Sequence, residues 1–295
     1  MNPDTPWQAG RLDAAPGPQR LLFGQMYEDA EIERETFRGL GRIFCIASAG
    51  DTAMLLSQEH EVLACDINPV QLAYARRHAN GAPRETGDAD RAMRFLRSFA
   101  PLTGWTKQRL ERFLGLSDPA EQLQFWRDQL DTARFRAGFN LILSRPMLRV
   151  MYSQQFLLAL PPHFGSILRG RFEKGIARHP NAANPYIHAH LLGIPIESPK
   201  PVATDIEFAA GDAASVLETC APGSFAGFTL SNILDGAAQS YRHRLIRAIR
   251  RAATSNAVVV LRSFAEPANS GDTNDAERDR SMLWGVLDIR SVNSL

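Results

Sequence analysis

The residues best suited to chemistry stand where apolar runs of the sequence end. The turn Ser48-Ala49-Gly50-Asp51 closes the run RIFCIAS, and Asp66 closes the next run, EVLACD, eighteen residues after Ser48. A glycine turn lets the backbone approach a ligand, and a helix that starts there offers free amides. An acidic side chain at this spacing is suited to accept both hydroxyls of a ribose. Together the turn and Asp66 predict a nucleoside-binding site.

The pattern fits NAD and S-adenosylmethionine (SAM) alike, and a third acidic turn helps to choose between them. The first turn lacks the three-glycine spacing that admits a pyrophosphate. A further apolar run, IEFAA, ends at Gly211-Asp212, and Ala213 opens a helical pattern after it. In methyltransferase-like folds a carboxylate at this place holds the exocyclic amine of adenine. The competing role for Asp212 is that of a helix N-cap. Because the first turn lacks the glycine spacing and Asp212 stands where adenine is held, we favour SAM over NAD.

Strand and helix patterns alternate in both halves of the chain. The first two apolar runs are each followed by a helical stretch, and the second stretch opens with the capping pair Asn68-Pro69. The runs IEFAA, FAGFTL and NAVVVLRSF repeat the strand pattern later, and RDRSMLWGVLDIRSV closes the chain as an expected edge strand. This order predicts an α/β fold with a Rossmann-type, class I methyltransferase-like parallel sheet.

Two regions do not belong to this alternation. Residues 88–200 show an almost wholly helical pattern, which is too long for an ordinary crossover and predicts a large helical insertion. Residues 1–40 begin as a Pro-, Gly- and Ala-rich arm and continue as a broken helical stripe from Leu22 to Phe37. We expect one or two short helices there, acting as a lid. The predicted organisation is an arm and lid at 1–40 and one Rossmann-type SAM-binding domain at 41–295, interrupted by the insertion.

Composition narrows the class of partner. Lysine and arginine total 33 against 32 acidic residues, so the net charge of +1 gives no bulk field for nucleic acid or anionic membrane. No apolar run approaches the ~20 residues that span a bilayer, and the first residues lack the apolar core of a secretory signal. The three cysteines lack metal or redox spacing, and the pair His188 and His190 lacks a third ligand. We expect a cytoplasmic protein with a small-molecule partner, no metal, no nucleic acid and no integral membrane segment; its oligomeric state is left open.

Six motifs in the same order resemble one enzyme family. They are YED at 27–29, IASAGD at 46–51, CDINPVQLA at 65–73, SNILDG at 231–236, LRS at 261–263 and DRSMLWG at 279–285. They are similar to motifs of the bacterial betaine-lipid synthesis enzymes, the SAM:diacylglycerol 3-amino-3-carboxypropyltransferases. This chain is shorter than those enzymes and has Tyr27 where they usually carry Trp. Both departures favour a short relative that makes azetidine-2-carboxylate directly from SAM.

The resemblance implies a reaction at Cγ of the aminocarboxypropyl arm that releases 5′-methylthioadenosine. The leading hypothesis is intramolecular cyclisation of SAM to azetidine-2-carboxylic acid. The alternative is transfer of the 3-amino-3-carboxypropyl group to diacylglycerol or another acceptor. A methyltransferase and a non-catalytic SAM-binding protein are further alternatives. Cyclisation requires the arm to fold back and the amine to be neutral, and burial favours the neutral form.

The candidate catalytic residues are a strand-end pair and three tyrosines. Ser231 and Asn232 end the FTL run, and the Asn232 carbonyl can accept a hydrogen bond from the amine without keeping it protonated. Tyr27, Tyr152 and Tyr186 offer aromatic faces to a sulfonium through cation–π attraction. For Tyr152 and Tyr186, core packing is the competing role.

The ligand carboxylate needs a cation, and Arg262 and Arg280 are the candidates, although both suit structural ion pairs. Glu28 and Asp29 either anchor the lid, contact the ligand or are solvated acids at a helix start. The residues expected to bind SAM are Ser48, Ala49, Gly50, Asp51, Asp66, Ile67, Asn68, Gln71, Gly211, Asp212, Ala213, Arg262 and Arg280.

Overall fold

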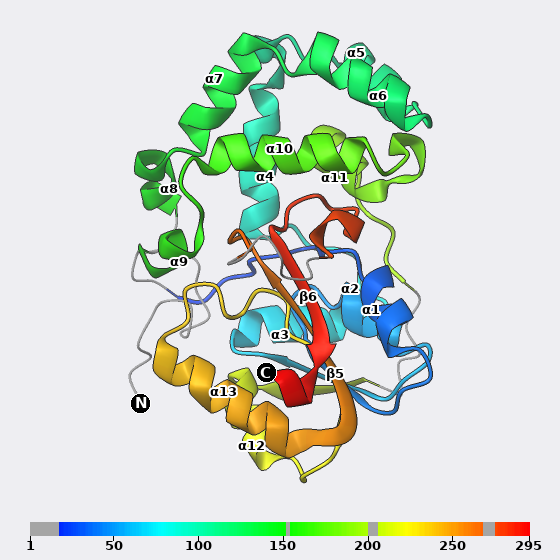
Figure 1. Cartoon of the computed structure of the whole chain (residues 1–295), viewed down its shortest axis with the longest axis vertical. Coiled ribbons are helices and arrows are strands. Elements are labelled where there is room, and N and C mark those ends of the chain that lie inside the picture. The colour runs from blue at the N-terminus through cyan, green and yellow to red at the C-terminus, as the bar shows by residue number, and fades with distance from the viewer. Residues whose placement is uncertain (1–17, 152–153, 200–205, 268–274) are drawn as a thin grey trace.

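A six-stranded sheet in the order β3-β2-β1-β4-β5-β6 forms the centre of the protein (Figure 1). The computed structural model describes residues 18–151, 154–199, 206–267 and 275–295. The strands are β1 (Ile43–Ile46), β2 (Val62–Asp66), β3 (Ile206–Ala210), β4 (Phe225–Thr229), β5 (Ala253–Ser263) and β6 (Val286–Ser291). All neighbours pair in parallel except β5 and the edge strand β6, which are antiparallel. The predicted Rossmann-type α/β sheet and its C-terminal edge strand are confirmed.

Helices cover both faces of the sheet, which explains why the strands are continuous apolar runs. On one face Phe44 and Phe228 pack with α12 (Ala213–Thr219) and α13 (Gln239–Ala252). On the other face residues of β1 and β2 pack with α1 (Glu31–Phe37), α2 (Asp51–Leu56) and α3 (Pro69–Ala79). Chain order reverses between β1 and β4, so polar residues that follow these strands meet at one sheet edge.

Residues between α3 and β3 form a block of helices with its own aromatic core. The helices are α4 (Asp88–Ser98), α5 (Lys107–Leu114), α6 (Pro119–Phe125), α7 (Ala133–Ile142), α8 (Arg145–Met151), α9 (Gln154–Ala159), α10 (Phe164–Ile176) and α11 (Pro185–Leu192). Trp105, Trp126 and Phe135 pack together inside the block. Figure 1 shows the block at one end of the long axis and α12 and α13 at the other. The predicted helical insertion is therefore present in the fold. No helix in the described ranges is long and apolar enough to cross a bilayer.

The N-terminal segment differs from its predicted form. Helix α1 is present, but residues 18–30 have no regular helix, so the expected helical stripe is wrong in its first half. The amides of Leu22 and Phe23 donate to Oε1 of Gln71, at 3.0 and 3.1 Å. These backbone donors are satisfied by a side chain of α3, so the segment gains nothing from helical hydrogen bonds there. The rest of the predicted arm, residues 1–17, lies outside the described residues.

Gly227 in β4 is expected to be required for close packing under α1. An added Cβ would lie 2.7 Å from Cδ1 of Ile43 and 2.9 Å from Cδ1 of Phe37. Gly227→Ala should therefore lower the free energy of unfolding by about 1–3 kcal/mol, measured by urea denaturation. The matched control is Gly170→Ala in α10, where an added Cβ would meet no neighbouring atom within 4 Å. Helix propensity should raise the free energy of unfolding of this variant by up to about 1 kcal/mol. Equal midpoints for the two variants would contradict this packing.

Candidate functional site

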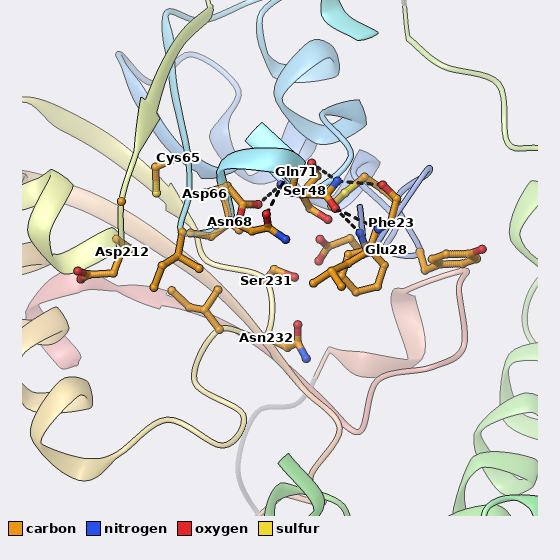
Figure 2. A pocket seen from close by; sticks show the side chains of 18 of the residues that line it. Phe23, Glu28, Ser48, Cys65, Asp66, Asn68, Gln71, Asp212, Ser231 and Asn232 are labelled. Atoms are coloured by element: carbon orange, nitrogen blue, oxygen red, sulfur yellow. Dashed lines mark hydrogen bonds between the residues drawn. The ribbon is translucent and has the colours of Figure 1, made fainter. Parts of the chain in front are cut away.

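A pocket opens at the carboxyl ends of β1, β2 and β4, where the chain order of the sheet reverses (Figure 2). It holds about 970 Å³ of empty space, counted out into the solvent at its mouth. Of the residues predicted from the sequence, the structure brings together on its wall Tyr27, Ser48, Asp66, Ile67, Asn68, Gln71, Gly211, Asp212, Ala213, Ser231 and Asn232.

Asp66 is held at the end of β2 by the backbone of two turns. Its Oδ1 accepts from the amide of Asn68 at 2.8 Å, and its Oδ2 accepts from the amide of Ser48 at 3.1 Å. Burial raises the pKa of Asp66 to about 7, although these two hydrogen bonds oppose the rise. The carboxylate is thus oriented before any ligand arrives, and one proton near neutral pH decides its charge.

Asn68 and Gln71 line the pocket while their polar atoms hold neighbouring backbone. Oδ1 of Asn68 accepts from the amides of Val70 and Gln71 and so caps α3. Nε2 of Gln71 donates to the carbonyls of Ser48 and Phe23, at 2.8 and 2.9 Å. One amide side chain therefore joins the first turn to the N-terminal segment that covers it.

Asp212 follows β3 and both caps a helix and lines the pocket. Its Oδ1 accepts from the amide of Ser215 at 3.0 Å, and its Oδ2 accepts from the hydroxyl of the same serine. Arg244 of α13 lies 3.8 Å from Oδ1. The N-cap role is therefore present, and the contact with adenine stays a prediction.

Two residues of the helical block, Asp90 and His190, hold the side chain of Tyr27 in place. Its hydroxyl donates to Oδ1 of Asp90 in α4 at 2.6 Å, and its ring stacks on His190 of α11 with centroids 5.8 Å apart. Burial lowers the pKa of His190 to about 4, so the imidazole is neutral at physiological pH. Its Nε2 lies 3.0 Å from the carbonyl of Ser281. Tyr27 thus presents a rigid aromatic ring at the pocket wall.

A buried arginine beside the pocket is surrounded by more acid than it can neutralise. Arg262 donates through Nε to Asp279 at 2.9 Å and through Nη1 and Nη2 to both oxygens of Glu33. Its Nη2 also donates to the carbonyl of Asp29, and its Nη1 lies 3.3 Å from Oε2 of Glu28. Three carboxylates thus face one guanidinium in the interior. Burial raises the pKa of Glu28 to about 7, while the charge of Arg262 lowers it and the neighbouring acids raise it further.

Arg262 and Arg280 are predicted to bind a ligand carboxylate, but the structure places neither on the pocket wall. The donors of Arg262 are occupied as described, and Arg280 donates through Nη2 to Oδ1 of Asp29 at 2.6 Å. Buried acids in the N-terminal segment pair with both guanidinium groups. Tyr186 also lies outside the pocket, under Arg280 at 5.7 Å from the ring centroid. Tyr152 lies outside the described residues.

Of the four residues in the first predicted turn, only Ser48 lines the pocket. Ser48 has φ of 43°, whereas Ala49, Gly50 and Asp51, which are also predicted to bind SAM, do not line the pocket. Gly50, with φ of 96°, precedes α2, a conformation that favours glycine. Oδ2 of Asp51 accepts from the amide of Met26 at 3.0 Å and so anchors the N-terminal segment.

The sequence does not predict several of the wall residues, and for Glu28 ligand contact is only one of the three roles that it suggests. The additional lining residues are Leu22, Phe23, Gln25, Met26, Glu28, Ile46, Cys65, Ile233, Tyr241 and Trp284. Ile46 and Cys65 stand next to strand ends, so their positions in the sequence contain a usable signal. The others come from irregular segments and from α13, where no local pattern points toward the pocket.

All charged residues on the described wall are acidic, and two turns that line it are strained. Glu28, Asp66 and Asp212 are acidic, and none of the described residues on this wall is lysine, arginine or histidine. Ser231 has φ of 49° and Ser48 has φ of 43°, a left-handed conformation that costs energy for residues other than glycine. Strain of this kind is concentrated at functional sites. The pocket therefore favours a ligand that is apolar in its body and positively charged.

His188 and His190 do not form a metal site with their surroundings. Nε2 of His188 lies 3.0 Å from the carbonyl of Asn181, and His190 contacts Ser281 as described. Within the described ranges there is no group of three or more His, Cys, Asp and Glu residues placed to hold an ion.

Comparisons with known proteins give only distant likenesses. No protein-family model matches the sequence, and the comparison with curated proteins gives no match. Among solved structures, the [4+2]-cyclase SpnF is 10% identical with a TM-score of 0.35, over 90% of this chain and 57% of that chain. The rRNA methyltransferase AviRa from Streptomyces viridochromogenes is 14% identical with a TM-score of 0.29, over 88% and 81%. The fold assignment therefore rests on the sheet order itself, which is that of a Rossmann-type, methyltransferase-like α/β domain.

The raised pKa of Glu28 predicts a pH-dependent effect on stability. The folded protein binds this proton with a pKa of about 7, against the ordinary 4.5, so stability falls as pH rises between these values. Glu28→Gln removes the penalty of the buried charge. The variant should exceed the wild type at pH 8 by on the order of 2–3 kcal/mol, with the difference vanishing near pH 4.

Urea denaturation at both pH values measures this difference. Glu35→Gln, on the exposed side of α1, is the matched control and should show no such trend. A Glu28→Gln variant less stable than the wild type at pH 8 would contradict the assignment.

Proposed function

We propose that this protein binds SAM in the pocket and catalyses a reaction at Cγ of its aminocarboxypropyl arm. The observation that carries the proposal is the charge of the wall, with three carboxylates and no basic side chain among its described residues. A pyrophosphate would be repelled there, whereas a sulfonium and an ammonium would be attracted. SAM combines these two cations with a neutral purine nucleoside and one carboxylate.

One orientation of SAM would match the residues at both ends of the pocket. Asp66 and Asp212, at the ends of neighbouring strands β2 and β3, suit the ribose hydroxyls and the adenine amine. Glu28 lies on the other side of the pocket, with Ser231 and Asn232 between the two sides (Figure 2). The sulfonium would then lie toward the ring of Tyr27, with the amino-acid arm beyond it.

We propose cyclisation to azetidine-2-carboxylate as the reaction. The sequence motifs support it, as does the burial of two wall residues, Glu28 and Trp284, which are 5% and 7% exposed. Exclusion of water favours a neutral amine and suppresses hydrolysis of the arm. The amine nitrogen bonds to Cγ, the Cγ–S bond breaks, and its electron pair remains on sulfur as neutral 5′-methylthioadenosine. Because the sulfonium is already an activated leaving group, catalysis consists largely of positioning.

Incubation of the purified protein with SAM alone, followed by mass spectrometry, tests the reaction. We expect azetidine-2-carboxylate and 5′-methylthioadenosine in equal amounts without an added acceptor. Turnover only after diacylglycerol or another acceptor is added would establish transfer of the aminocarboxypropyl group instead. S-adenosylhomocysteine would establish methyl transfer, and binding without any product would show a non-catalytic protein.

Asp66→Ala should raise the dissociation constant for SAM at least tenfold, a loss of ~1.4 kcal/mol, because two ribose hydroxyls lose their acceptor. Wild-type affinity should also weaken as pH falls below about 7, where the Asp66 carboxylate gains its proton, and this dependence should be smaller in the variant, where Glu28 is the remaining acid of the wall with a pKa of about 7. Titration calorimetry measures both, with the exposed Asp128→Ala as the matched control. Unchanged affinity of Asp66→Ala would remove Asp66 from the ribose site.

A further inference from the structure

Glu28 has a buried oxygen that no described residue satisfies. The residue is 5% exposed, lies on the pocket wall and adjoins Ser231 at the end of β4 (Figure 2). Its Oε2 has no hydrogen-bond partner within the part of the chain that the structure describes. Leaving a buried acceptor without a hydrogen bond destabilises the folded protein, so such an atom needs an explanation. A ligand bound in the pocket would supply the missing hydrogen-bond donor.

Arg262 holds Glu28 electrostatically and leaves this oxygen available. A guanidinium has five N–H donors. Those of Arg262 serve Asp279, both oxygens of Glu33 and the carbonyl of Asp29, and only Nη1, at 3.3 Å, approaches Glu28. The approach counts as an ion pair but does not satisfy Oε2 as a hydrogen bond. Of the three carboxylates that face Arg262, Glu28 is the one that lines the pocket, and its contact with the guanidinium is the longest.

Charged groups on every neighbouring element set the protonation of Glu28. Glu33 of α1 and Asp279, which precedes β6, favour the protonated form, and Arg262 of β5 favours the ionised form. The Ser231 hydroxyl also favours the ionised form, and burial, which opposes it, is the largest effect, raising the pKa to about 7. Cys45 of β1 stays a thiol, because burial raises its pKa well above the usual range. Glu28 can therefore exchange a proton near neutral pH.

We propose that Oε2 of Glu28 accepts the proton of the α-ammonium group of SAM before the ring closes. The inference rests on the proposed function and assigns its base. The ammonium proton moves to Glu28, and the freed lone pair forms the N–Cγ bond as the Cγ–S pair passes to sulfur. The products are 5′-methylthioadenosine and azetidine-2-carboxylate with a protonated ring nitrogen. Glu28 then releases its proton to solvent, so atoms and charge balance.

Glu28→Gln tests this role because glutamine can still accept a hydrogen bond but cannot take a proton. At saturating SAM and pH 7, 5′-methylthioadenosine formation should fall at least ~100-fold, the usual contribution of a general base. The dissociation constant for SAM, measured by calorimetry, should change far less than the rate. Glu35→Gln is the control, with the same substitution on the exposed side of α1 and off the pocket wall.

The pH profile separates a base from a residue that only supports Arg262. The wild-type kcat should rise with pH and level off near the pKa of Glu28. In Glu28→Gln the plateau should vanish and the residual rate should keep rising toward pH 8 and above, where a free α-ammonium group loses its proton. Glu28→Asp, which keeps a carboxylate, should restore part of the rate and a plateau, and it serves as the test variant if Glu28→Gln fails to fold.

The possible results distinguish the inference from the function on which it rests. If the wild type makes no azetidine-2-carboxylate from SAM alone, the proposed function fails and the role of Glu28 fails with it. If the wild type makes the product and Glu28→Gln keeps the same rate and pH profile, the function stands and Glu28 is not the base. Loss of SAM affinity in parallel with the rate, at an unchanged pH profile, would also overturn the inference.

Discussion

The ion cluster around Arg262 is the interaction on which the site depends. One fully buried guanidinium at the end of β5 binds Glu33 of α1, Asp279 before β6 and the backbone of Asp29. Removing Arg262 would leave its acids as uncompensated buried charges, and breaking a buried ion pair in this way typically costs about 3–5 kcal/mol. The cluster therefore ties the N-terminal segment and the C-terminal edge of the sheet to one point. That point adjoins the carboxyl ends of the central strands.

The surplus of acid in this cluster determines the sign of the pocket. Glu33 and Asp279 already exceed the charge of Arg262, so Glu28 adds negative charge that no nearby cation cancels fully. A protein gains no stability from such an arrangement by itself, because charge is buried with incomplete compensation. A bound cation would supply the missing charge. Under the proposed function, the ammonium group of the ligand would offset the cost of holding an ionised Glu28 in the interior.

The helical block contributes to the site through a few polar contacts. Asp90 of α4 accepts from the hydroxyl of Tyr27 and from the amide of Gly24, so it fixes the N-terminal segment over the strand ends. His190 stacks on the ring of the same tyrosine and, being neutral, does not repel a cation at the pocket. The block is therefore more than an appendage of the sheet, because it sets the position of one wall.

The sequence by itself determined the sheet and the polar residues at its strand ends. Apolar runs that end in Ser48, Asp66 and Asp212 are local signals, and parallel strands bring their carboxyl ends to one edge. The roles of Arg262 and Glu28 were decided only by the tertiary structure. A guanidinium suits a ligand carboxylate and a structural acid equally well, and its choice depends on which acid lies nearest after folding. In this fold Arg262 donates its hydrogen bonds to Glu33, which is distant in sequence, and to Asp279. Glu28, whose Oε2 has no hydrogen-bond partner among the described residues, lines the pocket.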